Sequence, residues 1–267
     1  MINKPNKVKP KKTPFIQPGV VPSCESVTGY AEDRANRVVD YLEKYTEIKG
    51  KNVLDIGSGN GDLILPVYQR NGTCYALEPD TGSLVFSRSR LGYLRTNINL
   101  IMGQGETLPF NHTVFDIVFC HQVLEHTERP DVVIQEAVRV LKPGGYLYLT
   151  CPNYLFPYEF HYKVPWIPYF PKRLAKIYLK MLGKSPSFLN DHIFYINTFN
   201  IEKMISESGL EVQANTYAEI VTNIYLKPKR RQIVNFLLGL LIFLHLPNHV
   251  AGALSPNVTI VAKKKVT

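Results

Sequence analysis

Three glycines at alternate positions follow a short apolar run and precede a helical stretch in VLDIGSGNG, residues 53–61. Glycine lets the backbone turn sharply and approach a ligand that any Cβ would displace, and the amides at the start of a helix point at such a ligand. The spacing is GxGxG, whereas pyrophosphate-binding loops have GxGxxG. Asp55, where the apolar run ends, can accept a hydrogen bond from a ligand's ammonium group. The segment predicts a loop for a ligand smaller than a dinucleotide.

An acidic residue ends the second apolar run of the chain. Glu78 lies in ALEPD, 21 residues after Gly57. In nucleotide-binding sheets a carboxylate at this place accepts hydrogen bonds from two ribose hydroxyls. A solvated carboxylate at a strand end is the alternative for an isolated acid. Together with the glycine loop, Glu78 predicts a ribose site.

The elements that must position these residues alternate along the chain. Apolar spacing predicts a helix from about Tyr30 to Tyr45 and then short strands separated by helices. The strands are expected in NVLDIG, TCYALEP, INLIMG, FDIVFC and GYLYLTCP, with helices from about residues 62, 81 and 131. Such alternation predicts a doubly wound α/β fold with a mainly parallel sheet, whose strands place their carboxyl ends along one edge. The ligand loop and Glu78 should meet at that edge.

The composition divides the chain into four segments. Residues 1–28 are basic and proline-rich and predict an extended arm, and residues 29–152 predict the ligand-binding core. Residues 153–195 interrupt the alternation with an aromatic- and proline-rich stretch, which predicts an insertion over the site. Residues 196–267 are expected to complete the core and include an apolar helix at about 232–246.

Five segments in order resemble the class I S-adenosylmethionine-dependent methyltransferases, particularly their broad small-molecule branch. They are VLDIGSGNG, ALEPD, GQGETLPF (103–110), FDIVFCHQVLEH (115–126) and RVLKPGGYLYLTCPN (139–153). The resemblance implies a seven-stranded sheet and S-adenosylmethionine as the cofactor. The cofactor-binding residues that it implies are Asp55, Gly57, Ser58, Gly59, Gly61, Glu78, Pro79, Gln104, Gly105, Glu106, Cys120 and His121.

Gln104 departs from the pattern of this family, which usually has an acid there to accept from the adenine amino group. A glutamine carbonyl can still accept that bond, and the amide of Gly105 or Glu106 would serve the adenine ring. A binding protein of the same fold without turnover is therefore one alternative, although its glycine loop and Glu78 would then be expected to degrade. A nicotinamide dehydrogenase is disfavoured by the glycine spacing.

The candidate catalytic residues are the histidines His121, His161 and His192. Methyl transfer is an in-line displacement that needs alignment and exclusion of water, and it needs a base only when the acceptor carries a proton to be removed. The insertion holds eight aromatic residues between positions 154 and 170, and Glu159 and His161 share a face if this stretch is extended. Each histidine has a structural role as its alternative. The acceptor is expected to be a small molecule, a sugar or a lipid-linked molecule, with O-, N- and C-methylation all open.

The net charge of +9 is concentrated in three short segments of the chain. Residues 1–12 hold five lysines, 227–231 four basic residues and 263–265 three lysines, so the rest of the chain is close to neutral. Solvated tails, an anionic membrane surface and an RNA substrate are the alternatives. A nucleic acid partner is disfavoured because no asparagine-proline-proline-aromatic tetrad follows the fourth strand.

The apolar run 233–246 is too short to cross a bilayer, since 14 helical residues rise about 21 Å against roughly 30 Å of hydrocarbon. It suits a buried helix or a helix on the membrane surface.

The four cysteines, Cys24, Cys74, Cys120 and Cys151, are dispersed and predict neither a metal site nor a disulfide framework. The amino end lacks the apolar segment of a signal peptide. A cytoplasmic location is expected, with a peripheral position on the inner face of a membrane as its variant. The sequence leaves the oligomeric state open.

Overall fold

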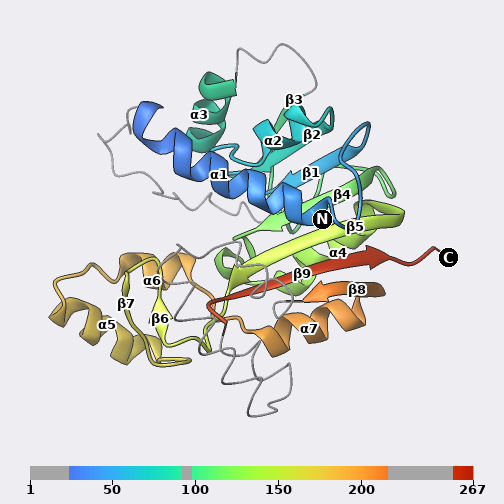
Figure 1. Ribbon diagram of the computed structural model, residues 1–267. Helices are drawn as coiled ribbons and strands as arrows, with labels where there is room; N and C mark the ends of the chain where they lie inside the picture. Colours follow the sequence, from blue (N-terminus) through green and yellow to red (C-terminus); the bar gives the residue numbers. More distant parts are fainter. Residues whose placement is uncertain (1–23, 92–97, 216–254, 267) are drawn as a thin grey trace, which may run out of the picture.

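The computed structural model describes residues 24–91, 98–215 and 255–266 (Figure 1). The strands are β1 Asn52–Ile56, β2 Thr73–Glu78, β3 Ile98–Met102, β4 Phe115–His121, β5 Leu141–Pro152, β6 Tyr158–Glu159, β7 Val164–Pro165, β8 Leu210–Asn215 and β9 Asn257–Lys264. The helices are α1 Cys24–Leu42, α2 Ile64–Gln69, α3 Thr81–Leu91, α4 Pro130–Val140, α5 Lys172–Met181, α6 Ser187–His192, α7 Thr198–Glu207 and the 3₁₀ turn η1 Leu124–His126.

Seven strands form one sheet in the order β3-β2-β1-β4-β5-β9-β8. The first five are parallel, β9 is antiparallel to β5, and β8 is antiparallel to β9. The predicted doubly wound, mainly parallel seven-stranded sheet is therefore confirmed. The order reverses at β1, whose neighbours are β2 and β4, so the carboxyl ends of these strands flank the switch point at which open α/β sheets bind ligands.

Two layers of apolar side chains sandwich the sheet. Val118 and Cys120 of β4 face one layer with α4 and α7, whereas Ile117 and Phe119 face the other layer with α1 and α2. Figure 1 shows α1, α2 and α3 on one side of the sheet and α4 and α7 on the other. Burial on both faces explains why these strands read as nearly continuous apolar runs in the sequence.

The insertion, residues 153–195, folds as the small hairpin β6-β7 followed by α5 and α6 (Figure 1). Its two ends lie together, because the amide of Tyr154 donates to the carbonyl of Ile196 at 3.0 Å. The amide of Phe194 donates to the carbonyl of Glu125 in η1 at 2.8 Å. Trp166 and Leu179 of the insertion belong to the same apolar cluster as strand β5, so the insertion packs on the main core.

Several boundaries differ from the predictions. Helix α1 begins at Cys24, inside the segment predicted as an extended arm, because apolar spacing marks only the part of a helix that packs on a core. Strand β5 begins at Leu141, which pairs with Phe115. A register shift between Phe115 and Ile117 absorbs the turn that the sequence places before the strand.

The rest of the predicted arm and the apolar helix at about 232–246 lie outside the described residues. Among the helices that the structure describes, none combines the length and the apolar character that crossing a bilayer requires.

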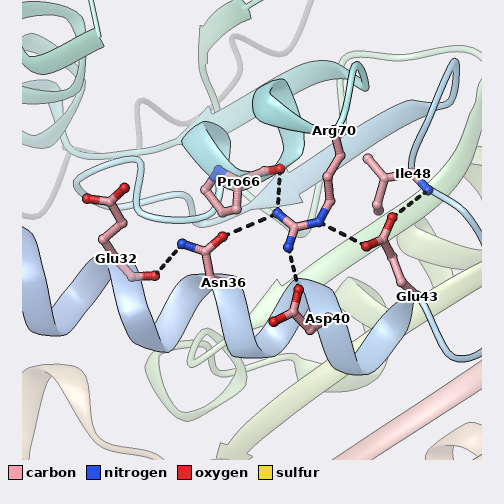
Figure 2. A network of polar contacts seen from close by, with 7 residues as sticks. All are labelled: Glu32, Asn36, Asp40, Glu43, Ile48, Pro66 and Arg70. Atoms are coloured by element: carbon pink, nitrogen blue, oxygen red, sulfur yellow. Dashed lines mark hydrogen bonds and ion pairs between the residues drawn. The ribbon is translucent and has the colours of Figure 1, made fainter.

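Arg70, directly after α2, fastens α1 to the core (Figure 2). Its guanidinium donates to Glu43 at 2.9 Å, to Asn36 at 3.2 Å and to the carbonyl of Pro66 at 3.0 Å, and it pairs closely with Asp40. A single planar guanidinium thus joins two residues of α1, the following Glu43 and the backbone of α2.

We expect Arg70→Ala to lower the free energy of unfolding by about 1–2 kcal/mol, because several part-buried charge-assisted hydrogen bonds are lost together. Urea unfolding followed by circular dichroism measures the change. Arg129→Ala is the matched control, since the Arg129 side chain is 64% exposed and pairs with Asp131 in a surface ion pair, its one ion pair among the described residues. Equal effects of the two substitutions would show that the Arg70 network contributes nothing beyond an ordinary surface pair.

Candidate active site

The glycine loop joins the ends of β1 and β2. The amides of Gly57 and Ser58 both donate to the carbonyl of Leu77, at 2.8 and 3.0 Å. Gly57 has a φ of 66°, and a Cβ there would lie 2.6 Å from Cγ2 of Val123. A side chain at this position would therefore meet both backbone strain and the segment after β4. Nothing lies within 4 Å of the position a Cβ would take on Gly59, so this part of the loop is open to a ligand.

Glu78 holds the loop and retains capacity for a ligand. One carboxylate oxygen accepts from the amide of Gly59 at 2.8 Å, and the other accepts from the amide of Asp80 at 2.9 Å. Burial raises the pKa of Glu78, and these two amides partly oppose the rise. Each oxygen keeps a further lone pair, so the carboxylate can accept one hydroxyl on each side, as two neighbouring ribose hydroxyls require.

Two further polar side chains of the loop region are buried. Asp55 is 3% exposed, and its burial, followed by the charges of Glu78 and Asp62, holds its pKa well above the usual value. A cationic ligand group beside Asp55 would favour its charged form. The buried hydroxyl of Ser58 has no hydrogen-bond partner among the described residues. Both groups suit a ligand with an ammonium and a carboxylate, such as the methionine part of S-adenosylmethionine.

The turn 103–107 follows β3 beside the end of β2. The amide of Gly103 donates to the carbonyl of Glu78 at 3.3 Å, and Gln104, which is exposed, bridges to Thr107. The hydroxyl of Thr127 donates to the carboxylate of Glu106. The side chain of Glu106 therefore helps to fix the turn, and contact of its amide with an adenine stays a prediction. Sequence reasoning missed Thr127, which no motif marks.

Cys120 and His121 end β4. Burial raises the pKa of the Cys120 thiol, which therefore stays protonated. Burial, and then the charge of Arg34, lower the pKa of His121 to about 3. A histidine this weakly basic is a poor acceptor for a hydroxyl proton at neutral pH, although its neutral ring can still contact a ligand.

His161 lies in a cluster of acids and histidines between the insertion and η1. Its Nδ1 lies 2.7 Å from Oε1 of Glu159, and its ring packs against those of His126 at 5.6 Å and Phe188 at 5.2 Å. Burial alone would lower the pKa of His161, but the hydrogen bond to Glu159 and the charges of Glu159 and Glu125 together raise it. If Nδ1 is the nitrogen that donates to Glu159, the neutral ring keeps the lone pair of Nε2 for a substrate proton.

Glu159 is held in place to orient that ring. It is 2% exposed, and its second oxygen accepts from the amide of Tyr162 at 2.6 Å. The predicted proximity of Glu159 and His161 on one face is therefore seen in the structure. A carboxylate that fixes one ring nitrogen and strengthens the other as a base is a recurrent arrangement in catalysis.

Glu125 of η1 is the most unusual acid of the cluster. It is fully buried, and neither oxygen of its carboxylate has a hydrogen-bond partner in the part of the chain that the structure describes. Burial raises its pKa to about 7, although its own backbone amide and the charge of His161 oppose the rise. Nε2 of His126 lies 3.8 Å from Oε1 of Glu125. A buried acid whose oxygens accept no hydrogen bond from the described residues is a candidate for contact with a substrate.

The donor atoms of Glu125, His126 and His161 lie within 4.8 Å of one another, close enough to share a divalent cation. The sequence predicts no metal, and that prediction remains to be tested by chelation. The orientation of His161 by Glu159 serves a proton acceptor and a metal ligand equally well. With a pKa raised to about 7, Glu125 exchanges its proton near neutral pH, and the pKa of His161 is raised from its usual value by the neighbouring carboxylates.

The raised pKa of Glu125 predicts a pH-dependent stability. Between the usual value of 4.5 and about 7 the unfolded chain has lost this proton while the folded chain keeps it. Stability therefore falls as the pH rises through this window, and the loss is complete above pH 7 at roughly 3 kcal/mol. We expect Glu125→Gln to match the parent near pH 4 and to exceed its free energy of unfolding by roughly that amount at pH 8.

Urea unfolding at intervals from pH 4 to pH 8 measures this difference. Glu207→Gln is the control, because the Glu207 side chain is 65% exposed on α7 and its replacement should change stability little. A difference between parent and Glu125→Gln that does not grow with pH would show that Glu125 does not bind its proton more tightly in the folded chain.

The third predicted histidine, His192, is the last residue of α6, and its side chain lies outside what the structure describes.

Gly61 belongs to the loop, and its amide donates to the carbonyl of Ser58 at 2.8 Å. Pro79 follows Glu78, and Gly105 packs close to Ile56 and Val133. The structure thus gathers the predicted cofactor residues along the carboxyl ends of β1 to β4, and the roles of individual residues remain predictions.

Comparisons with known proteins agree with this geometry. Residues 54–149 match the family described as "Methyltransferase domain". The ubiquinone biosynthesis O-methyltransferase of Vibrio cholerae is 28% identical over 185 residues, which is 66% of this chain and 67% of that protein.

Solved structures show the same fold at lower identity. An S-adenosylmethionine-dependent methyltransferase from Mesorhizobium loti has a TM-score of 0.58 at 15% identity and covers 88% of this chain and 99% of its own. The cyclase SpnF has a TM-score of 0.56 at 18% identity, covering 87% of this chain and 82% of its own. Since a cyclase shares the fold, the fold alone does not define the reaction.

Residues 54–149 match the methyltransferase domain, and the sheet order with the glycine loop and Glu78 is that of the class I S-adenosylmethionine-dependent methyltransferases. The chain carries the methyltransferase domain of this class, and its cofactor is S-adenosylmethionine.

Proposed function

We propose that the chain methylates a hydroxyl group of a small-molecule or lipid-linked acceptor, bound between η1 and the insertion 153–195. The observation that carries this proposal is the pair Glu159–His161, which faces the buried Glu125 at the carboxyl end of β4. A hydroxyl acceptor must lose its proton on methylation, and this cluster supplies an oriented acceptor for it. The relatives include ubiquinone biosynthesis O-methyltransferases, which supports oxygen as the acceptor atom.

Each part of the site has a task in this reaction. When bound, S-adenosylmethionine supplies a methyl group on a positively charged sulfur. Glu78 would hold the ribose, Asp55 and Ser58 would face the methionine part, and the turn 103–106 would meet the adenine. The acceptor proton passes to Nε2 of His161, and Glu159 stabilises the resulting imidazolium. The insertion would exclude water from the space around the positioned hydroxyl.

A cytoplasmic location, on the inner face of a membrane when the acceptor is lipid-linked, is part of the same proposal. Four aromatic residues of the insertion, three of them buried and one half-buried, support an apolar or ring-containing acceptor. They are Tyr154, Tyr162, Trp166 and, half-buried, Tyr195.

The test uses the purified full chain with S-adenosylmethionine that carries a labelled methyl group. Extracts of cells that lack the gene provide candidate acceptors, and mass spectrometry locates the label in the product. We expect an O-methylated product whose formation survives dialysis against a chelator. Label on nitrogen or carbon would contradict the hydroxyl assignment, and loss of activity restored by one divalent cation would assign the cluster to a metal. Binding of S-adenosylmethionine without any labelled product would favour the binding-protein alternative.

A further inference from the structure

Helix α5 exposes an apolar row on the outside of the insertion. Leu174, Ile177 and Met181, the apolar row, are 54%, 58% and 81% exposed. Their spacing of three and four residues places them on one stripe of the helix. Ala175 and Leu179, on the inner side, are fully buried in the core. The outer apolar side chains are therefore not required to hold the helix in place.

A row of positive charges runs beside the apolar row. Arg173, Lys176 and Lys180, the cationic row, have the same spacing one residue earlier, which turns them about 100° around the helix. The whole stretch from residue 160 to residue 190 contains no aspartate or glutamate. It contains three more lysines, at positions 163, 172 and 184. The charged residues of this stretch are thus all of one sign.

The apolar surface continues beyond the helix. Ile167 and Leu182 are 61% and 46% exposed. Next to them lies an apolar groove of about 270 Å³, lined by Pro157, Pro165, Trp166, Ile167, Phe170 and Tyr178. Figure 1 shows α5 at the outer end of the insertion, away from the sheet. Exposed apolar patches of this kind usually mark interaction sites.

We propose that this face of α5, formed by the apolar and cationic rows, docks on the surface of an anionic lipid bilayer. Apolar side chains beside a row of lysine and arginine are what insertion at a charged lipid interface requires. A second copy of the chain would bring like charges together. A nucleic acid would use the cationic row but leave the apolar row in water. The proposal concerns α5 and is independent of the segment 227–246.

Vesicle flotation with the full chain tests the proposal. We expect binding to vesicles of phosphatidylglycerol and phosphatidylcholine, weaker binding as salt is added, and little binding to phosphatidylcholine alone. Leu174→Ser, Ile177→Ser and Met181→Ser together should lower the partition coefficient at least tenfold. Replacing the three residues of the cationic row with glutamine should lower it roughly a hundredfold, since each basic residue near the surface strengthens binding several-fold.

The control combines exposed residues of other surfaces. Val85→Ser and Phe199→Ser with Lys203→Gln change side chains that are 64%, 49% and 74% exposed on α3 and α7. This variant should bind vesicles as the parent does. All variants should bind S-adenosylhomocysteine with the parent's affinity in calorimetry, because the cofactor site lies at the sheet edge. Loss of that affinity would count against the proposed function, whereas the docking of α5 on lipid is judged by vesicle binding alone.

The fluorescence of tryptophan locates the contact, because Trp166 is the one tryptophan of the chain and lines the groove beside α5. Lipids brominated on their acyl chains should quench it when the insertion meets the bilayer. Parent-like vesicle binding by both row variants, with unquenched tryptophan, would overturn the proposal and assign lipid binding to other basic segments. Failure of the parent to bind anionic vesicles would overturn it as well.

Discussion

Glu78→Ala is expected to weaken binding of S-adenosylmethionine and S-adenosylhomocysteine by roughly 30-fold to 1000-fold. The carboxylate accepts from the amides of Gly59 and Asp80 and offers its remaining lone pairs to two hydroxyls of the ribose. Removing two charge-assisted bonds to the ligand costs roughly 2–4 kcal/mol, which gives that range of affinities. The two amides also lose their acceptor, so the loop that carries Gly59 is expected to loosen.

Isothermal titration calorimetry with S-adenosylhomocysteine measures the change directly. Glu207→Ala, on the exposed side of α7, is a matched control and should leave the affinity unchanged. The affinity of Glu78→Gln should lie between those of the parent and the alanine variant. The glutamine carbonyl oxygen can still accept a hydrogen bond, but its NH2 group cannot accept one from a backbone amide. An alanine variant that is folded and binds with the parent's affinity would place the ribose away from the end of β2.

His161→Ala is expected to lower kcat by roughly 100-fold to 10,000-fold while the affinity for S-adenosylmethionine stays within about twofold. The histidine belongs to the insertion and contacts Glu159, His126 and Phe188, none of which belongs to the predicted cofactor residues. The substitution should therefore lower turnover without weakening cofactor binding. His112→Ala, an exposed histidine before β4, is the control and should keep full activity.

The pH profile tests the orienting role of Glu159. The base must be unprotonated, so kcat/KM should fall as the pH drops through the pKa of His161, which lies above its usual 6.5. Glu159→Gln keeps an acceptor for Nδ1 but removes the charge that raises this pKa, so the acid limb should move to lower pH. An unmoved limb in Glu159→Gln would mean that another group titrates, and full activity of His161→Ala would mean that alignment alone suffices.

The cofactor half of the site was predictable because its chemistry follows chain order. The loop after β1 and the acid after β2 are each marked by local sequence, and parallel strands bring such ends to one edge whatever the details of packing. The structure adds the hydrogen bond by which Glu78 holds Gly59, which joins two motifs that the sequence shows separately.

The acceptor half was less predictable because it depends on how an irregular insertion packs. The two-residue spacing of Glu159 and His161 allowed their pairing to be expected, but nothing in the sequence placed them against Glu125 and His126. The complete burial of Glu125, and with it the rise of its pKa to about 7, is a tertiary property. Thr127 was missed for the same reason, since its partner Glu106 is 21 residues away.

The hydrogen bond between the amide of Tyr154 and the carbonyl of Ile196 gives the insertion an evolutionary meaning. The insertion leaves the end of β5 and returns to the same place before α7 begins, so substitutions, lengthening or shortening between these residues need not disturb any strand of the sheet. The insertion carries its proposed contacts with the acceptor, whereas the predicted contacts with the cofactor lie outside it. Acceptor specificity and cofactor binding can therefore diversify independently. During evolution the acceptor can thus change through changes in the insertion alone, while selection continues to preserve the cofactor-binding residues.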